Sequence, residues 1–299
     1  MNWQFFIEVL LGGLLSGVMY SLVALGFVLI YKASGVFNFA QGAMVFFAAL
    51  TCVGLRDLGM PLWVAGLITV VVMVVLGLAI EKFVLRPLVA QPEITLFMAT
   101  IGLTFLVEGL AQIIWGTGVR KLELGVEDVP MQWLMDSAGL SVSQFDLMAA
   151  AVAAVLVTVL AVFFSKTKVG RALRAVADDH QAALAVGIPL QQIWGIVWAV
   201  AGFVALVAGL LWGARNGVQF SLTALALKAL PVLILGGFTS VPGAIIGGLI
   251  IGASEKLAEV YIGPMVGGGI ESWFPYVLAL GVLLIRPEGL FGEKIIRRI

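Results

Sequence analysis

The chain has 299 residues, of which 62% are hydrophobic and only 11% are charged, and its mean hydropathy is +1.12. A soluble globular domain carries about 25% charged residues, so this composition excludes an ordinary water-soluble protein. Long apolar runs recur along the sequence, whereas the alternating segments of a transmembrane barrel do not occur. The composition therefore predicts an all-α integral membrane protein with several crossings.

Net charge and rare residue types exclude several functions. The formal net charge is zero, so no overall field attracts nucleic acid. Cys52 is the sole cysteine and His180 the sole histidine, so neither residue type can build a metal cluster. The sequence also lacks a P-loop, an H-E-x-x-H motif and a G-x-S-x-G motif. We therefore expect a protein that is not an enzyme and that binds no metal or cofactor of its own.

Nine apolar runs are candidates for membrane crossings. In chain order they lie at 6–30, 36–55, 60–80, 94–116, 145–164, 193–214, 222–236, 243–260 and 273–286. The second, seventh, eighth and ninth are short or contain Gly and Pro, so we expect eight to ten crossings. Broken helices at membrane depth are tolerated only where protein or a water-filled cavity surrounds them. We interpret residues 1–299 as one transmembrane domain.

The positions of the basic residues predict an orientation. If the polar loop 165–192 is cytoplasmic, most of the 17 lysines and arginines lie on the cytoplasmic side. This bias satisfies the positive-inside rule, with the N-terminus outside and the C-terminus in the cytoplasm. The polar loop 117–144 then lies on the outer, periplasmic side.

The loop 165–192 has the composition of a short helical hairpin. Two alanine-rich stretches, 170–177 and 180–186, favour helix, and Gly187 is placed to end the second one. The small side chains give a smooth surface that suits insertion into a groove on a partner protein. The alternative is a basic, solvated connection that only fixes the topology.

Polar groups inside the apolar runs are costly, so each of them is a functional candidate. Asn38 and Gln41 lie three residues apart on one helix face, where they could stabilise a broken helix or line a translocation pathway. Lys228 lies three residues before Pro231, whose ring frees a backbone carbonyl, and both are further candidates for the translocation pathway. Lys228 could form a structural pair, or face an aqueous pathway and attract a carboxylate.

Small and charged residues mark two further surfaces. Glycines spaced four apart allow neighbouring helix backbones to approach closely. The densest group, which predicts close helix packing, is Gly243, Gly247, Gly248 and Gly252. Glu255, Lys256 and Glu259 follow at the outer end of the eighth run, where we expect a solvated surface or, as the alternative, contact with a partner protein.

Five stretches resemble, in the same order, permease subunits of bacterial branched-chain amino acid ABC importers. The stretches are Asn38-Phe39-Ala40-Gln41-Gly42, Ile80-Glu81-Lys82 with Arg86-Pro87, Gly170-Arg171-Ala172-Leu173-Arg174 through Gly187-Ile188, 235–248, and 286–292. The resemblance implies a transport subunit of the bacterial inner membrane that forms the translocation pathway by alternating access. It is expected to import branched-chain or related amino acids.

The resemblance also implies the partners. They are a second, related permease, two cytoplasmic ATPases that carry the ATP, and a periplasmic substrate-binding protein. The residues that it places in contact with the ATPases are Gly170, Arg171, Ala172, Arg174, Ala175, Asp178, Asp179, Ala183, Gly187 and Ile188. Urea and short-chain amide importers have similar permeases and form the nearest alternative. An autonomous secondary transporter would need paired intramembrane carboxylates, whereas Glu108 alone is expected near the middle of a run.

Overall fold

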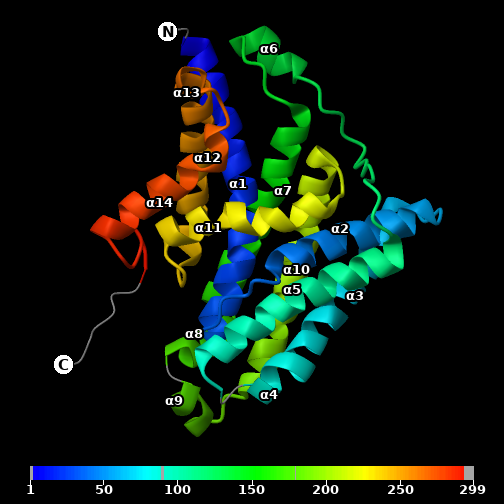
Figure 1. Cartoon of the computed structure of the whole chain (residues 1–299), viewed down its shortest axis with the longest axis vertical. Helices are drawn as coiled ribbons and strands as arrows, with labels where there is room; N and C mark the ends of the chain where they lie inside the picture. The colour runs from blue at the N-terminus through cyan, green and yellow to red at the C-terminus, as the bar shows by residue number, and fades with distance from the viewer. Residues whose placement is uncertain (1–2, 89–90, 179, 293–299) are drawn as a thin grey trace. The chain divides into compact units, whose positions relative to one another are not determined.

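The computed structural model describes residues 3–88, 91–178 and 180–292, and these are mainly helical (Figure 1). The elements are α1 (Trp3–Ser34), α2 (Gln41–Asp57), α3 (Leu62–Ile80), η1 (Glu81–Leu85), α4 (Arg86–Leu88), α5 (Glu93–Trp115), α6 (Gln132–Ala138), α7 (Gln144–Lys166), α8 (Lys168–Asp178), α9 (His180–Ala185), α10 (Leu190–Asn216), η2 (Phe220–Ala224), α11 (Leu225–Gly236), α12 (Val241–Tyr261), α13 (Gly263–Val266), η3 (Ile270–Ser272) and α14 (Phe274–Ile285). In this described part, β-type pairing is limited to two isolated bridges, Arg120 with Val218 and Pro130 with Ser143. The all-α prediction is confirmed.

Each of the nine predicted runs forms a helix. Six helical stretches are long and apolar enough to cross a membrane, namely Trp3–Ser34, Leu62–Leu88, Ile94–Trp115, Gln144–Lys166, Leu190–Asn216 and Val241–Tyr261. The second, seventh and ninth runs form the shorter helices α2, α11 and α14, as their Gly and Pro content predicts. The eighth run differs, because α12 is an unbroken helix of 21 residues. Its Pro242 lies in the first turn of the helix. A backbone N–H in the first turn has no intrahelical acceptor, so the missing N–H of proline costs no hydrogen bond there.

One compact unit consists of residues 25–124 and 159–226. Its centre is α2, whose residues are buried from Gln41 to Leu55. A helix that is apolar on every side needs cover on every side, and α3, α5, α10 and η2 pack against it. Gly209 of α10 permits a close approach, because a β-carbon there would lie 2.5 Å from the carbonyl oxygen of Val45.

In the same unit, α3 continues into α4 through the π-helical turn η1. Such turns accommodate an extra residue and are frequent at functional positions. The buried carboxylate of Glu81 accepts two hydrogen bonds from the guanidinium of Arg86, at 3.2 and 3.0 Å. This bidentate ion pair links Glu81, the first residue of the turn, to Arg86, which directly follows the turn.

The other compact unit consists of residues up to 24, residues 125–158 and residues from 227 onward. Within it, α12 lies against backbone on two sides. Gly248 and Gly252 face α1, where a β-carbon on Gly252 would lie 2.5 Å from Cα of Gly17. Gly243 and Gly247 face α11, and a β-carbon on Gly247 would lie 2.7 Å from the carbonyl oxygen of Val232. All four glycines of the predicted packing group therefore lie where a side chain would not fit.

Candidate functional site

The long polar loop folds as a helical hairpin, α8 followed by α9, as its composition predicts. Helix α8 buries Leu173 and Val176 and exposes Arg171 and Arg174. The guanidinium of Arg174 donates a hydrogen bond to the carbonyl oxygen of Phe164 in the last turn of α7, at 3.3 Å. A cation suits this position because the carbonyls at a helix C-terminus carry partial negative charge.

Helix α9 ends in a Schellman motif, the hydrogen-bonded turn that commonly stops a helix at a glycine. Gly187 has a left-handed φ of +82°. The N–H of Ile188 donates to the carbonyl oxygen of Ala183 at 2.9 Å, and the N–H of Gly187 donates to that of Leu184 at 3.0 Å. Leu184 and Val186 are 55% and 75% exposed. This turn, residues 184–187, therefore holds two apolar side chains in the open, and we call it the hairpin tip.

The remaining residues that the resemblance assigns to ATPase contact differ in exposure. Gly170 is buried against the backbone of Phe164, and Ala183 is 2% exposed, so both positions serve the packing of the hairpin. Partly exposed are Ala172, Ala175 and Ile188. Asp179 lies outside the described residues, and for Asp178 only the backbone is described.

Asn38 and Gln41 meet at the break between α1 and α2, as their spacing predicts. Nδ2 of Asn38 donates to Oε1 of Gln41 at 3.3 Å, and Oδ1 of Asn38 accepts from the N–H of Ala40 at 3.1 Å. Both side chains are fully buried. Among the described residues, Nε2 of Gln41 has no hydrogen-bond partner. The pair stabilises the break, and a role in a translocation pathway stays a prediction.

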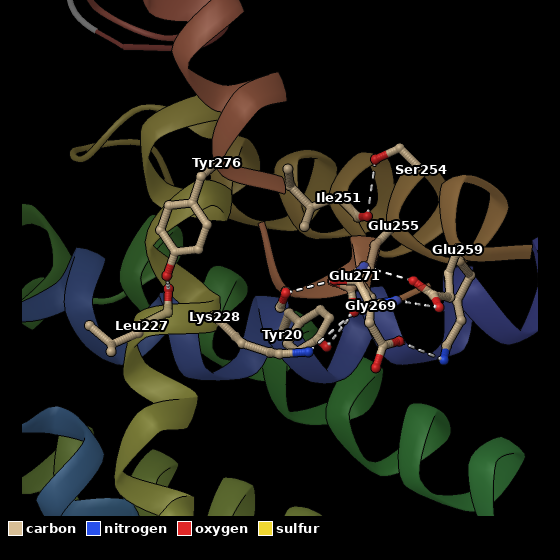
Figure 2. A network of polar contacts seen from close by, with 12 residues as sticks. Tyr20, Leu227, Lys228, Ile251, Ser254, Glu255, Glu259, Gly269, Glu271 and Tyr276 are labelled. Atoms are coloured by element: carbon tan, nitrogen blue, oxygen red, sulfur yellow. Dashed lines mark hydrogen bonds and ion pairs between the residues drawn. The ribbon is translucent and has the colours of Figure 1, made fainter. Parts of the chain in front are cut away.

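Lys228 forms an ion pair with a carboxylate of α12 (Figure 2). Its Nζ lies 3.5 Å from Oε1 of Glu255, which also accepts a hydrogen bond from the hydroxyl of Tyr20 at 3.2 Å. Glu255 is 3% exposed, so the expectation that it lies on a solvated surface is wrong. It follows Gly252 by three residues and Gly248 by seven, and it therefore shares the face of α12 that packs against α1.

The rest of this charge cluster orders the chain that follows α12 (Figure 2). Nζ of Lys256 lies 3.2 Å from Oε2 of Glu271, and both side chains are partly exposed. The Glu259 carboxylate accepts hydrogen bonds from the N–H groups of Gly269 and Glu271, each at 3.0 Å. These contacts are internal to the unit.

Pro231 lies inside α11, and a residue of α14 compensates for its missing N–H. Because proline cannot donate, the carbonyl of Leu227, four residues earlier, loses its helical partner. The hydroxyl of Tyr276 donates to this carbonyl at 2.7 Å (Figure 2). The sequence predicts the freed carbonyl, and the structure identifies its donor.

Replacing Tyr276 with phenylalanine should destabilise the fold by about 0.5–1.5 kcal/mol, because it removes the hydrogen bond to the freed carbonyl of Leu227. In a Pro231→Ala background the same change should cost much less, since alanine restores the N–H. Thermal unfolding of the four purified proteins in detergent gives this double-mutant cycle. An equal cost of Tyr276→Phe in both backgrounds would contradict the compensation.

Two of these residues, Tyr20 and Tyr276, were missed by sequence analysis. For Tyr20 a signal was available, because a buried tyrosine inside an apolar run needs a hydrogen-bond partner for its hydroxyl. The partners lie on other helices, however, so spacing within one helix does not identify them.

Comparison with known proteins establishes the family. Residues 9–286 match the family model described as the branched-chain amino acid transport system permease component. The chain belongs to this family. The permease is 26% identical over 319 residues to the high-affinity branched-chain amino acid transport system permease protein LivH of Escherichia coli K12, which covers 100% of this chain and 99% of LivH. It is 29% identical to the probable branched-chain amino acid transport permease protein LivH of Methanocaldococcus jannaschii, over 95% and 92% of the two chains.

Among solved structures, the permease aligns with PsaBC from Streptococcus pneumoniae in complex with Fab, at 16% identity over 94% of each chain and a TM-score of 0.48. Family membership rests on the sequence matches, which confirm the resemblance found in the five stretches. The permease is thus a multi-pass membrane protein and a transport subunit.

Proposed function

We propose that the permease is the membrane subunit of an ATP-binding-cassette importer for branched-chain or related amino acids in the bacterial inner membrane. Its partners are a second, related permease, two cytoplasmic ATPases that carry and hydrolyse the ATP, and a periplasmic substrate-binding protein. The observation that carries the proposal is the match of residues 9–286 to the permease family, together with the full-length similarity to LivH.

In this proposal the α8–α9 hairpin receives the ATPases. The exposed Leu184 and Val186 at the hairpin tip fit an apolar groove, and the exposed Arg171 adds a charged rim. Both hairpin helices pack against α10. A displacement of the hairpin is therefore passed to α10, and ATP-driven closure of the partners biases the permease between two packings.

Two other functions make different demands on the chain. A secondary transporter couples to ions through intramembrane carboxylates that are free to bind them. Here the buried Glu255 already has Lys228 as its counter-ion. A urea or short-chain amide importer would share the whole architecture and differ in its uncharged substrate.

The test begins with the tagged permease, solubilised from its native membrane and analysed by mass spectrometry for bound partners. We expect two ATPases and a second permease. The recovered complex is then reconstituted in proteoliposomes with its substrate-binding protein, and uptake of L-leucine and of urea is measured with and without ATP. ATP-dependent uptake of leucine supports the proposal. Recovery of the chain alone, with ion-driven uptake in ATP-free proteoliposomes, contradicts it, and uptake of urea instead of leucine contradicts the substrate class.

A further inference from the structure

The Lys228–Glu255 ion pair contains an enclosed carboxylate, and the other charged residues of its cluster, Lys256, Glu259 and Glu271, are partly exposed. Glu255 has a side chain that is only 4% exposed, so water contributes little to its solvation. A buried carboxylate without a partner is strongly destabilising. Lys228 supplies the opposite charge and the Tyr20 hydroxyl supplies a hydrogen bond, so this carboxylate is stable only while a cation is beside it.

The two members of the pair differ in access. The Lys228 side chain is 38% exposed, whereas Glu255 is enclosed behind it. The separation of 3.5 Å is longer than the 2.7–2.9 Å that is usual for a charge-assisted hydrogen bond. Lys228 is therefore the accessible member of the pair, and a displacement of its ammonium would open access to the enclosed carboxylate.

We propose that Lys228 and Glu255 bind the charged head group of a zwitterionic amino acid, an inference that rests on the function proposed above. In the bound state the ligand carboxylate lies beside Lys228, in the place of Glu255. The ligand ammonium lies beside Glu255 and the Tyr20 hydroxyl, in the place of Lys228. Every charge keeps an opposite neighbour, so the exchange leaves no ion unpaired.

The charge balance of this site selects a class of ligand. A zwitterion adds no net charge, whereas a simple carboxylate or a simple amine would bring one unpaired charge into a poorly solvated place. Urea and amides are uncharged and cannot replace either member of the pair. The site therefore recognises the head group common to all α-amino acids and leaves the choice of side chain to other contacts.

The neighbouring ion pair offers a matched control. Lys256 and Glu271 have the same chemistry, lie 3.2 Å apart in the same unit, and both are partly exposed. Because neither is enclosed, removing their charges exposes no buried ion. The test variant is Lys228→Met with Glu255→Gln, which keeps the side-chain sizes and removes both charges together. The control variant is Lys256→Met with Glu271→Gln.

The experiment measures ATP-dependent uptake of L-leucine by the reconstituted importer that contains each variant. We expect Lys228→Met/Glu255→Gln to recover its partners and to lose uptake at least about tenfold, because two charged contacts to the ligand are gone. The control pair should stay within about twofold of the wild type. The exchanged variant, Lys228→Glu with Glu255→Lys, retains an ion pair and should also lose uptake, because the ligand would meet the charges in the reverse order.

Two results would overturn the inference and mark the ion pair as purely structural. One is near-normal uptake by the neutral double variant, including the case in which each single change is harmful and the second change restores transport. The other is near-normal uptake by the exchanged variant. Failure of the proposed function is seen separately, because the wild-type importer would then show no ATP-dependent uptake of any amino acid.

Discussion

Replacing Gly13 with alanine should destabilise the permease by about 3 kcal/mol, the upper part of the range for overpacking a tight contact. A β-carbon on Gly13 would lie 2.6 Å from the carbonyl oxygen of Gly252 and 2.8 Å from Cα of Ala253. Both atoms belong to the backbone of α12, which cannot move aside as a flexible side chain can. The two helices would have to separate along the whole contact that also includes Gly17 and Gly248.

Gly12 provides a control one residue earlier in the same helix. A β-carbon there meets nothing within 4 Å, so Gly12→Ala should leave stability unchanged or raise it slightly through better helix propensity. Thermal unfolding of the purified variants in detergent measures both changes. Equal melting temperatures for Gly12→Ala and Gly13→Ala would show that α1 and α12 do not approach as closely as described.

Val186→Asp should weaken binding of the ATPases by more than about 100-fold, which corresponds to about 3 kcal/mol, and should abolish ATP-dependent uptake. Val186 is 75% exposed at the hairpin tip, so an aspartate there changes the stability of the isolated chain little. In a partner's apolar groove the same carboxylate would be buried without a counter-charge. A loss of ATPase binding in this variant can therefore be assigned to docking and not to misfolding. A charged substitution at the buried Ala183 would disturb both.

The comparison for this variant is Val119→Asp. Val119 is 69% exposed and lies outside the hairpin, so it controls for the addition of one negative charge to the surface. Copurification of the ATPases, quantified by mass spectrometry, is the measurement, and membrane insertion is checked in parallel. Retention of the ATPases by Val186→Asp, or equal loss in both variants, would contradict docking at the hairpin tip.

Much of the fold follows from the lengths of the apolar runs. The run 193–214 became α10, Leu190–Asn216, because a bilayer-length apolar segment satisfies its backbone hydrogen bonds only as a helix. The hairpin helices were predictable for a local reason as well, since alanine content and Gly187 act within one segment. Predictions of this kind need no knowledge of which helices are neighbours.

The candidate site depends on neighbours, and there the sequence was insufficient. Periodicity could not show whether Lys228 is paired, because Glu255 lies on a different helix and its burial depends on what covers that face of α12. Glu255 looked like a surface charge because Lys256 and Glu259 follow it closely, yet those two residues are partly exposed whereas Glu255 lies where α12 packs against α1. Composition likewise gave no sign that Ala183 is buried, because alanine suits an exposed and a packed face equally well.

The π-helical turn Glu81–Leu85 should make this stretch of the permease more tolerant of a one-residue deletion than an ordinary helix is. Deleting one residue from a normal helix turns everything after it by about 100°, which separates every pair on one face. Here one residue of the turn, for example the exposed Phe83, can be deleted, and the π-helical turn then becomes an ordinary α-helical turn. Glu81 and the arginine would then be four residues apart and would still share a face of an ordinary α-helix. A single deletion at this point should therefore disturb the fold less than the loss of the Arg86 side chain.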